Sequence, residues 1–161
     1  MPRGCNCVSS VLIVDDNIFN LFALETLLMT KRQLHSVRAE NGALAIDKFL
    51  ENRRQSHKCN CGKGFKLILM DINMPVMDGC SATEHILRHQ RQYEEETANI
   101  NKVRLETGEP PLIIHGLSVV AVTSYTNKAN INQCLRVGMK EVAHKPIDHK
   151  EIVALIDRYN K

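Results

Sequence analysis

Short aliphatic runs that alternate with stretches of helical periodicity constrain the fold of this chain more than any other feature. Residues 11–14, 66–70 and 119–122 are continuous apolar runs, which is typical of strands buried on both faces of a parallel sheet. Weaker strand candidates lie at 34–39 and 141–144. The segments between them have helical spacing or a capping Asn or Asp, and helices are expected at about 17–29, 41–52, from 81 onward, 128–137 and from 148 to the C-terminus.

Five strands alternating with five helices predict a doubly wound α/β domain whose parallel strands are joined by right-handed crossovers. Two stretches, at about 53–65 and 90–116, exceed the usual length of a loop and are predicted to be insertions on the compact core. We therefore divide the chain into an N-terminal arm, residues 1–9, and one domain, residues 10–161.

The composition of the chain excludes several functional classes. Its 161 residues suffice for one domain, and 43% hydrophobic with 24% charged residues excludes wholesale disorder. A net charge of +3 is too small to indicate a nucleic-acid partner. No apolar run approaches the roughly 18–20 residues that cross a bilayer, so this segment is expected to make no membrane contact and to lie in the cytoplasm.

Polar side chains follow four of the five predicted strands. Asp15 and Asp16 follow the first, Asp71 the third, Thr123 ends the fourth, and Lys145 follows the fifth. In an open parallel sheet these strand ends share one edge, where ligands bind. Three carboxylates alone would repel one another, so they imply a hard divalent cation, and oxygen ligands favour Mg²⁺. Asp71 could then act as a nucleophile, with Thr123 and Lys145 meeting the oxygens of a transferred phosphoryl group.

Each of these residues also has a purely structural interpretation. The acidic pair Asp15-Asp16 could cap a helix, Thr123 could be an ordinary satisfied hydroxyl, and Lys145 a solvated side chain. Asp78-Gly79 is most simply a turn before a helix. The shared position at the ends of strands favours a common site over four separate coincidences.

The same residues resemble the receiver domain of two-component response regulators. The resemblance is carried by Val14-Asp15-Asp16-Asn17, the segment 70–79 with Asp71-Ile72-Asn73-Met74-Pro75, Ala121-Val122-Thr123-Ser124 and His144-Lys145-Pro146. It covers about residues 10–161 apart from the two insertions. It implies a flavodoxin-like receiver fold with the strand order 2-1-3-4-5.

The resemblance also implies roles for individual residues. Asp71 would accept a phosphoryl group from a phosphohistidine on a histidine kinase or histidine phosphotransfer domain, and the domain would then switch conformation. Mg²⁺ would be bound by Asp15, Asp16, Asp71 and the main-chain carbonyl of Asn73. Thr123 would be the switch hydroxyl, and the peptide bond after Lys145 would be cis. The domain would assist its own phosphorylation and dephosphorylation.

One position departs from the family, because Val142 stands where such domains commonly carry Tyr or Phe, so an aromatic switch is not implied. The opening segment 15–20 resembles receivers attached to hybrid histidine kinases, and we expect a C-terminal module of such a kinase. Two alternatives stay open: a pseudo-receiver that acts as an interaction scaffold without phosphorylation, and a flavin or nucleotide binder. The complete set of polar residues disfavours the first, and the missing glycine-rich loop after the first strand disfavours the second.

Two identical tripeptides, Cys5-Asn6-Cys7 and Cys59-Asn60-Cys61, indicate a structural Zn²⁺ site with four thiolate ligands. Each tripeptide precedes one of two strands that are neighbours in the order 2-1-3-4-5, at nearly equal distances along the chain, so both should lie at the edge opposite Asp71. His57 could replace one thiolate. Free thiols and disulfides are the alternatives, the latter disfavoured in the cytosol. Cys80 and Cys134 are expected to be ordinary thiols on helices.

Overall fold

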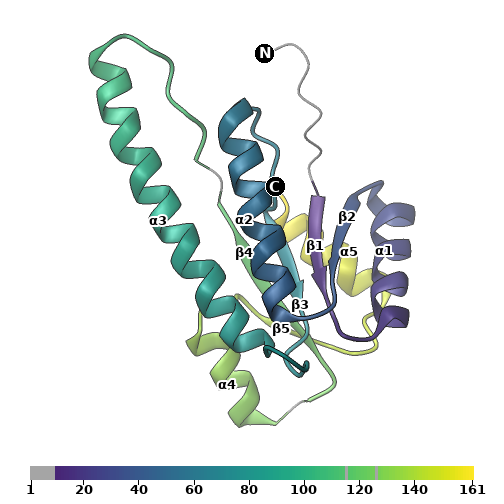
Figure 1. Cartoon of the computed structure of the whole chain (residues 1–161). Helices are drawn as coiled ribbons and strands as arrows, with labels where there is room; N and C mark the ends of the chain where they lie inside the picture. Colours follow the sequence, from purple (N-terminus) through teal and green to yellow (C-terminus); the bar gives the residue numbers. More distant parts are fainter. Residues whose placement is uncertain (1–9, 115, 126) are drawn as a thin grey trace.

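The computed structural model describes residues 10–114, 116–125 and 127–161, and of His57 only the backbone. In this part of the chain five parallel strands form one sheet in the order β2-β1-β3-β4-β5, which confirms the predicted topology (Figure 1). Val14 pairs with Met70, and Met70 with Ala121, so neighbouring strands end at the same edge. The strands are β1 (Ser10–Val14), β2 (His35–Ala39), β3 (Leu67–Met70), β4 (Ser118–Thr123) and β5 (Val142–His144).

Helices cover both faces of the sheet (Figure 1). Leucines of α1 and aliphatic residues of α5 pack on one face, and residues from α2, α3 and α4 pack on the other. None of the helices in the described ranges is both long and apolar enough to cross a membrane. The helices are α1 (Ile18–Arg32), α2 (Gly42–Cys59), α3 (Gly79–Glu106), α4 (Lys128–Arg136) and α5 (His149–Tyr159).

Short polar side chains start the helices where the sequence predicts. Asn17 accepts a hydrogen bond from the backbone N–H of Phe19 at 2.9 Å and caps α1. Asp148 caps α5 by accepting from two backbone N–H groups, each at 2.8 Å. Such caps satisfy N–H groups that have no partner inside the helix.

Two helices are longer than the sequence predicts. The first predicted insertion continues α2 as far as Cys59, and the second continues α3 as far as Glu106 (Figure 1). The segment after α3 then returns along the helix, where Asn101 and Leu112 exchange two hydrogen bonds of 2.9 and 2.7 Å. These extensions carry mostly polar residues, so apolar periodicity does not reveal them, and contacts between distant segments hold them in place.

Candidate functional site

The chain leaves β1 through two aspartates that differ in burial. Asp15 is 1% exposed, whereas Asp16 is exposed. The backbone N–H of Asn17 donates to Asp15 Oδ1 at 2.8 Å, and the side-chain amide of Asn20 donates to both carboxylate oxygens at 3.2 and 3.1 Å. The first turn of α1 therefore fixes the orientation of the Asp15 carboxylate.

Asp71 lies at the end of β3 and is 6% exposed. Its backbone N–H donates to Val14 O at 2.9 Å, which continues the pairing of β1 with β3. The loop after Asp71 folds back so closely that a Cβ at Gly79 would lie 2.0 Å from Asp71 O. Gly79 N also donates to Ile72 O at 2.8 Å. Only a residue without a side chain allows this approach, so Gly79 helps to define the position of Asp71.

Lys145 joins the two buried carboxylates. Its Nζ lies 2.5 Å from Asp15 Oδ2 and 3.1 Å from Asp71 Oδ2. Its backbone N–H donates to Thr123 O at 2.9 Å, which fixes the residue at the end of the sheet. The Lys145–Pro146 peptide bond is cis, as the resemblance to receiver domains implies. The structure thus places Asp15, Asp71 and Lys145 in contact with one another through the Lys145 ammonium.

The electrostatic balance of the site is set by burial. Burial raises the pKa of Asp71, and the neighbouring ammonium of Lys145 opposes this effect only in part. A desolvated carboxylate is less stable in its charged form, so it gains more from binding a cation or an electrophile than a solvated one would.

The three aspartates form a group that could hold a metal ion. One ligand atom from each of Asp15, Asp16 and Asp71 can be chosen so that all three lie within 4.8 Å of one another. Carboxylate oxygens at this spacing fit a hard divalent cation such as Mg²⁺, which uses few carboxylates and retains several waters. Asn73 follows in the loop and is exposed, and the role of its main-chain carbonyl stays a prediction.

Thr123 ends β4 at the same edge and is completely buried. Its Oγ1 accepts a hydrogen bond from the backbone N–H of Tyr125 at 3.1 Å. Thr123 pairs with His144, the last residue of β5, and Lys145 directly follows it, so the hydroxyl and the ammonium lie at the ends of neighbouring strands. Val142, at the position where an aromatic residue is common, is half-buried at the start of β5.

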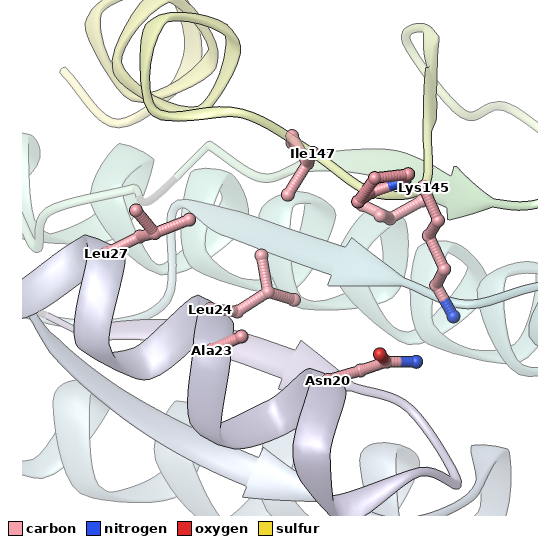
Figure 2. A pocket seen from close by; sticks show the side chains of 8 residues that line it. Asn20, Ala23, Leu24, Leu27, Lys145 and Ile147 are labelled. Carbon is pink, nitrogen blue, oxygen red and sulfur yellow. The ribbon is translucent and has the colours of Figure 1, made fainter.

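A small cavity of about 90 Å³ lies beside the site, between α1 and the segment after β5 (Figure 2). Leu24 and Leu27 of α1 face Ile147 across it, and Lys145 lines the end near the acidic site (Figure 2). Asn20, which orients Asp15, lines the same cavity. Sequence reasoning missed Asn20 and the close approach of Gly79. Asn20 could have been found from its position, because it lies five residues after Asp15 in the first turn of the predicted helix.

The second predicted site is only partly described. Cys59 and Cys61 lie at the end of α2 with their Sγ atoms 2.8 Å apart. Cys5 and Cys7 lie outside the described residues, so the four-thiolate site stays a prediction. Cys80 and Cys134 are both buried, and burial raises the pKa of Cys80 to about 12, which fits unreactive core thiols.

Comparison with known proteins agrees with the arrangement of the site. The family model described as the response regulator receiver domain matches residues 11–98. The chain is 31% identical over 159 residues to hybrid signal transduction histidine kinase M of Dictyostelium discoideum, covering 94% of this chain and 5% of that protein. It is 33% identical over 152 residues to the response regulator mcs4 of Schizosaccharomyces pombe, covering 86% and 25%.

Solved structures show the same fold. Chemotaxis protein CheY4 of Vibrio cholerae is similar with a TM-score of 0.67 and 21% identity, covering 94% of this chain and 98% of that one. The complex of the Saccharomyces cerevisiae phosphotransfer protein Ypd1 with the receiver domain of Ssk1 gives a TM-score of 0.64 and 23% identity, covering 96% and 88%. The chain spans only 5–25% of the length of the first curated relatives that it matches.

Proposed function

This chain belongs to the response regulator receiver domain family of two-component phosphorelays, and we propose that Asp71 is its phosphoacceptor. The observation that carries this proposal is the contact of one ammonium, Lys145 Nζ, with both Asp71 and Asp15. A receiver that had become a pure scaffold would have no need to keep a desolvated carboxylate beside an acidic metal site. The pseudo-receiver alternative is therefore not favoured.

The proposed reaction moves one phosphoryl group. A carboxylate oxygen of Asp71 attacks the phosphorus of a phosphohistidine, the new O–P bond forms, and the P–N bond breaks with the electron pair returning to the imidazole. The ammonium of Lys145 is near enough to pair with a phosphoryl oxygen at Asp71. Asp71, desolvated in the resting site, is oriented for attack by its backbone and by Gly79.

Asp15, Asp16, Asp71 and the main-chain carbonyl of Asn73 are the proposed ligands of Mg²⁺. When bound, the ion would neutralise negative charge that gathers around the phosphoryl oxygens. The chain itself contributes the fixed orientation of Asp15, held by Asn17 and Asn20. The same site would assist later hydrolysis of the aspartyl phosphate.

Phosphorylation is proposed to shift an equilibrium between two conformations. A phosphoryl group on Asp71 offers new acceptor oxygens to the Thr123 hydroxyl and to the Lys145 ammonium. Thr123 ends β4, and Lys145 directly follows β5. Movement of Thr123 would break its hydrogen bond with the backbone of Tyr125 and so change the segment after β4.

The proposed partner is a histidine kinase or a histidine phosphotransfer domain. Three large apolar side chains at the start of α1 are exposed close to Asp15: Ile18 (57%), Phe19 (80%) and Phe22 (62%). Exposed apolar groups gathered beside a reaction site are typical of a docking surface. Figure 2 shows the adjoining cavity beside Ala23, which could receive a side chain of the partner. A solved neighbour is itself a complex of a phosphotransfer protein with a receiver.

We also propose that the module operates in the cytoplasm as part of a larger hybrid histidine kinase. The support is the similarity to hybrid signal transduction histidine kinases that are many times longer than this chain. The kinase activity of those relatives would reside in segments that the match does not cover.

The function is tested by incubating the full chain with Mg²⁺ and acetyl phosphate and measuring its intact mass. The wild type should gain one phosphoryl group, and Asp71→Asn should gain none. Asp47→Asn, an exposed position on α2, is the matched control and should be labelled like the wild type. A label that persists in Asp71→Asn would overturn the assignment.

A structural Zn²⁺ bound by Cys5, Cys7, Cys59 and Cys61 is proposed as a second, independent site. Support comes from the close approach of Cys59 and Cys61, which follows from left-handed backbone at Asn60 (φ 45°) between them. Two thiolates of one tetrahedral zinc lie about 3.8 Å apart, so the Sγ atoms of Cys59 and Cys61 would have to separate by about 1 Å on binding the metal.

The zinc proposal is tested by elemental analysis of the purified chain. About one zinc per chain is expected, with loss in the double variant Cys59→Ser, Cys61→Ser and retention in Cys80→Ser, which replaces a thiol of the core. A metal-free chain with four alkylatable thiols would refute the zinc site and leave the phosphorylation proposal untouched.

A further inference from the structure

A cavity of about 420 Å³ opens between α2 and α3, remote from the phosphorylation site. Its lining residues begin about two helical turns inside α2 and further inside α3, whereas Asp71 lies beside Gly79, the first residue of α3. Phe49, Leu50 and Tyr93 give it an apolar lining. Its volume falls in the range of small-molecule pockets, roughly 300–1,000 Å³.

One buried cation borders this cavity. Arg53 is 5% exposed, and its guanidinium lies between two aromatic rings, 5.2 Å from the centroid of Phe49 and 5.3 Å from that of Tyr93. Nε donates to Gln90 Oε1 at 2.9 Å and Nη2 donates to Phe65 O at 3.2 Å. Both acceptors are neutral, so neither compensates the charge.

The charge of Arg53 has no direct counter-ion within the described part of the chain. Nη1 is buried without a hydrogen-bond partner and lies beside Gly64, 3.4 Å from where a Cβ of that residue would be. No ion pair joins Arg53 to a carboxylate in the described residues. Burial lowers the pKa of Arg53 to about 10, which leaves it charged at neutral pH. Glu94 is linked to Arg53 only through Gln90, whose side-chain amide donates to Glu94 Oε1 at 2.5 Å. A desolvated cation of this kind attracts an anion strongly.

The rim of the cavity strengthens the positive character. Arg54 and His89 line it, and the acidic group among the lining residues, Glu96, already accepts a hydrogen bond from Gln92 at 2.9 Å. Two basic side chains beside an apolar lining and a buried guanidinium favour a ligand that is anionic at one end and apolar at the other.

We propose that the α2–α3 cavity binds a carboxylate carried on an aromatic or branched apolar group. The apolar group packs against Phe49, Leu50 and Tyr93, and the carboxylate pairs with Arg54 at the rim. The buried charge of Arg53, whose terminal nitrogens lie beside Gly64 and Phe65, adds a long-range attraction for the anion. A free acid and an acidic side chain of a peptide offer the same chemistry. This site is separate from the proposed phosphoacceptor and does not depend on it.

The proposal is tested on the ¹⁵N-labelled full chain by NMR titration with benzoate. Saturable shifts are expected for amides of α2 and α3 around the cavity, with much weaker binding of acetate, which lacks the ring, and of benzyl alcohol, which lacks the charge. A capped heptapeptide of leucine and glutamate tests whether the natural ligand is an acidic side chain of a peptide. Tighter binding than benzoate would identify the ligand as a peptide, and weaker binding would identify it as a free acid. Absence of saturable binding by both probes would overturn the proposal.

Variants localise the effect. Arg54→Gln should weaken benzoate binding by roughly threefold, as when a unit charge about 6 Å away is removed in water. Arg136→Gln removes the same charge from an exposed position on α4 and should change nothing. Arg53→Gln removes the buried charge and should weaken benzoate binding at least as much as Arg54→Gln. If this variant fails to fold, the comparison of Arg54→Gln with Arg136→Gln still tests the proposal. Equal affinities in wild type and Arg54→Gln would overturn the proposal.

Discussion

Replacing Lys145 with methionine removes one positive charge from the acidic site and keeps most of the length of the side chain. Nζ of Lys145 lies 3.1 Å from Asp71 Oδ2. Two unit charges at that distance interact by about 1.3 kcal/mol in water and by about 5 kcal/mol at an effective dielectric constant of 20. The Lys145 side chain is 16% exposed, so the effective interaction lies between these limits.

The substitution is expected to make Asp71 harder to ionise. Burial already raises the pKa of Asp71, and Lys145 opposes that effect. Without the ammonium the pKa should rise further, because the loss of about 1.3 kcal/mol or more of attraction lowers the acid dissociation constant of the carboxyl about tenfold or more. Carbon-detected NMR titration of the Asp71 carboxyl measures the change, and Lys140→Met, at an exposed position, is the matched control.

The fold of Lys145→Met should stay intact, because the ammonium contacts carboxylates rather than the aliphatic core. Circular dichroism checks this point. An Asp71 pKa that stays the same or falls would refute the inference that the ammonium stabilises the ionised carboxylate. Global unfolding of the variant would instead give Lys145 a structural role.

Three further predictions concern the site and its supports. Asp71→Asn should raise the free energy of unfolding at neutral pH but not near pH 3. The pKa of Asp71 is raised in the folded state, so its ionisation destabilises the folded protein as the pH rises through that pKa; urea denaturation at both pH values measures the difference. Gly79→Ala should lower the free energy of unfolding by at least about 2 kcal/mol, since its Cβ would meet Asp71 O, whereas Gly116→Ala has free space and should cost little; no difference between them would refute the close approach. Asp16→Asn should weaken Mg²⁺ binding about tenfold or more in titration calorimetry, and unchanged affinity would place the metal elsewhere.

The sheet could be predicted because its strands are uninterrupted aliphatic runs. The expected strand at 66–70 is observed as Leu67–Met70, and 119–122 as Ser118–Thr123. Caps at Asn17 and Asp148 fixed the starts of two helices. These signals are local, and the structure confirms them within a residue or two.

The lengths of α2 and α3 could not be predicted, because their extensions depend on contacts between distant segments. Arg53 bonds to Gln90 of α3 and to the backbone of Phe65, partners that lie 37 and 12 residues away. Ile113 N donates to Asn60 Oδ1 at 2.7 Å, which ties the segment after α3 to the end of α2. No periodicity in the sequence encodes such pairs.

The site residues could be predicted as a group, because each follows a strand. Their individual contacts could not. The amide of Asn20 on Asp15, and the double contact of Lys145 with Asp15 and Asp71, depend on side-chain orientation at the junctions of strands and helices. The sequence predicts only a turn at Asp78-Gly79, and the close approach of Gly79 to the backbone of Asp71 is seen only in the structure.

The central claim is that Asp71 carries the phosphoryl group. The most direct measurement phosphorylates the full chain with a phosphohistidine-bearing donor, reduces the acyl phosphate with borohydride, and locates the resulting homoserine by tandem mass spectrometry. The account predicts homoserine at position 71. Homoserine at position 15, 16 or 78 with position 71 unmodified would contradict it.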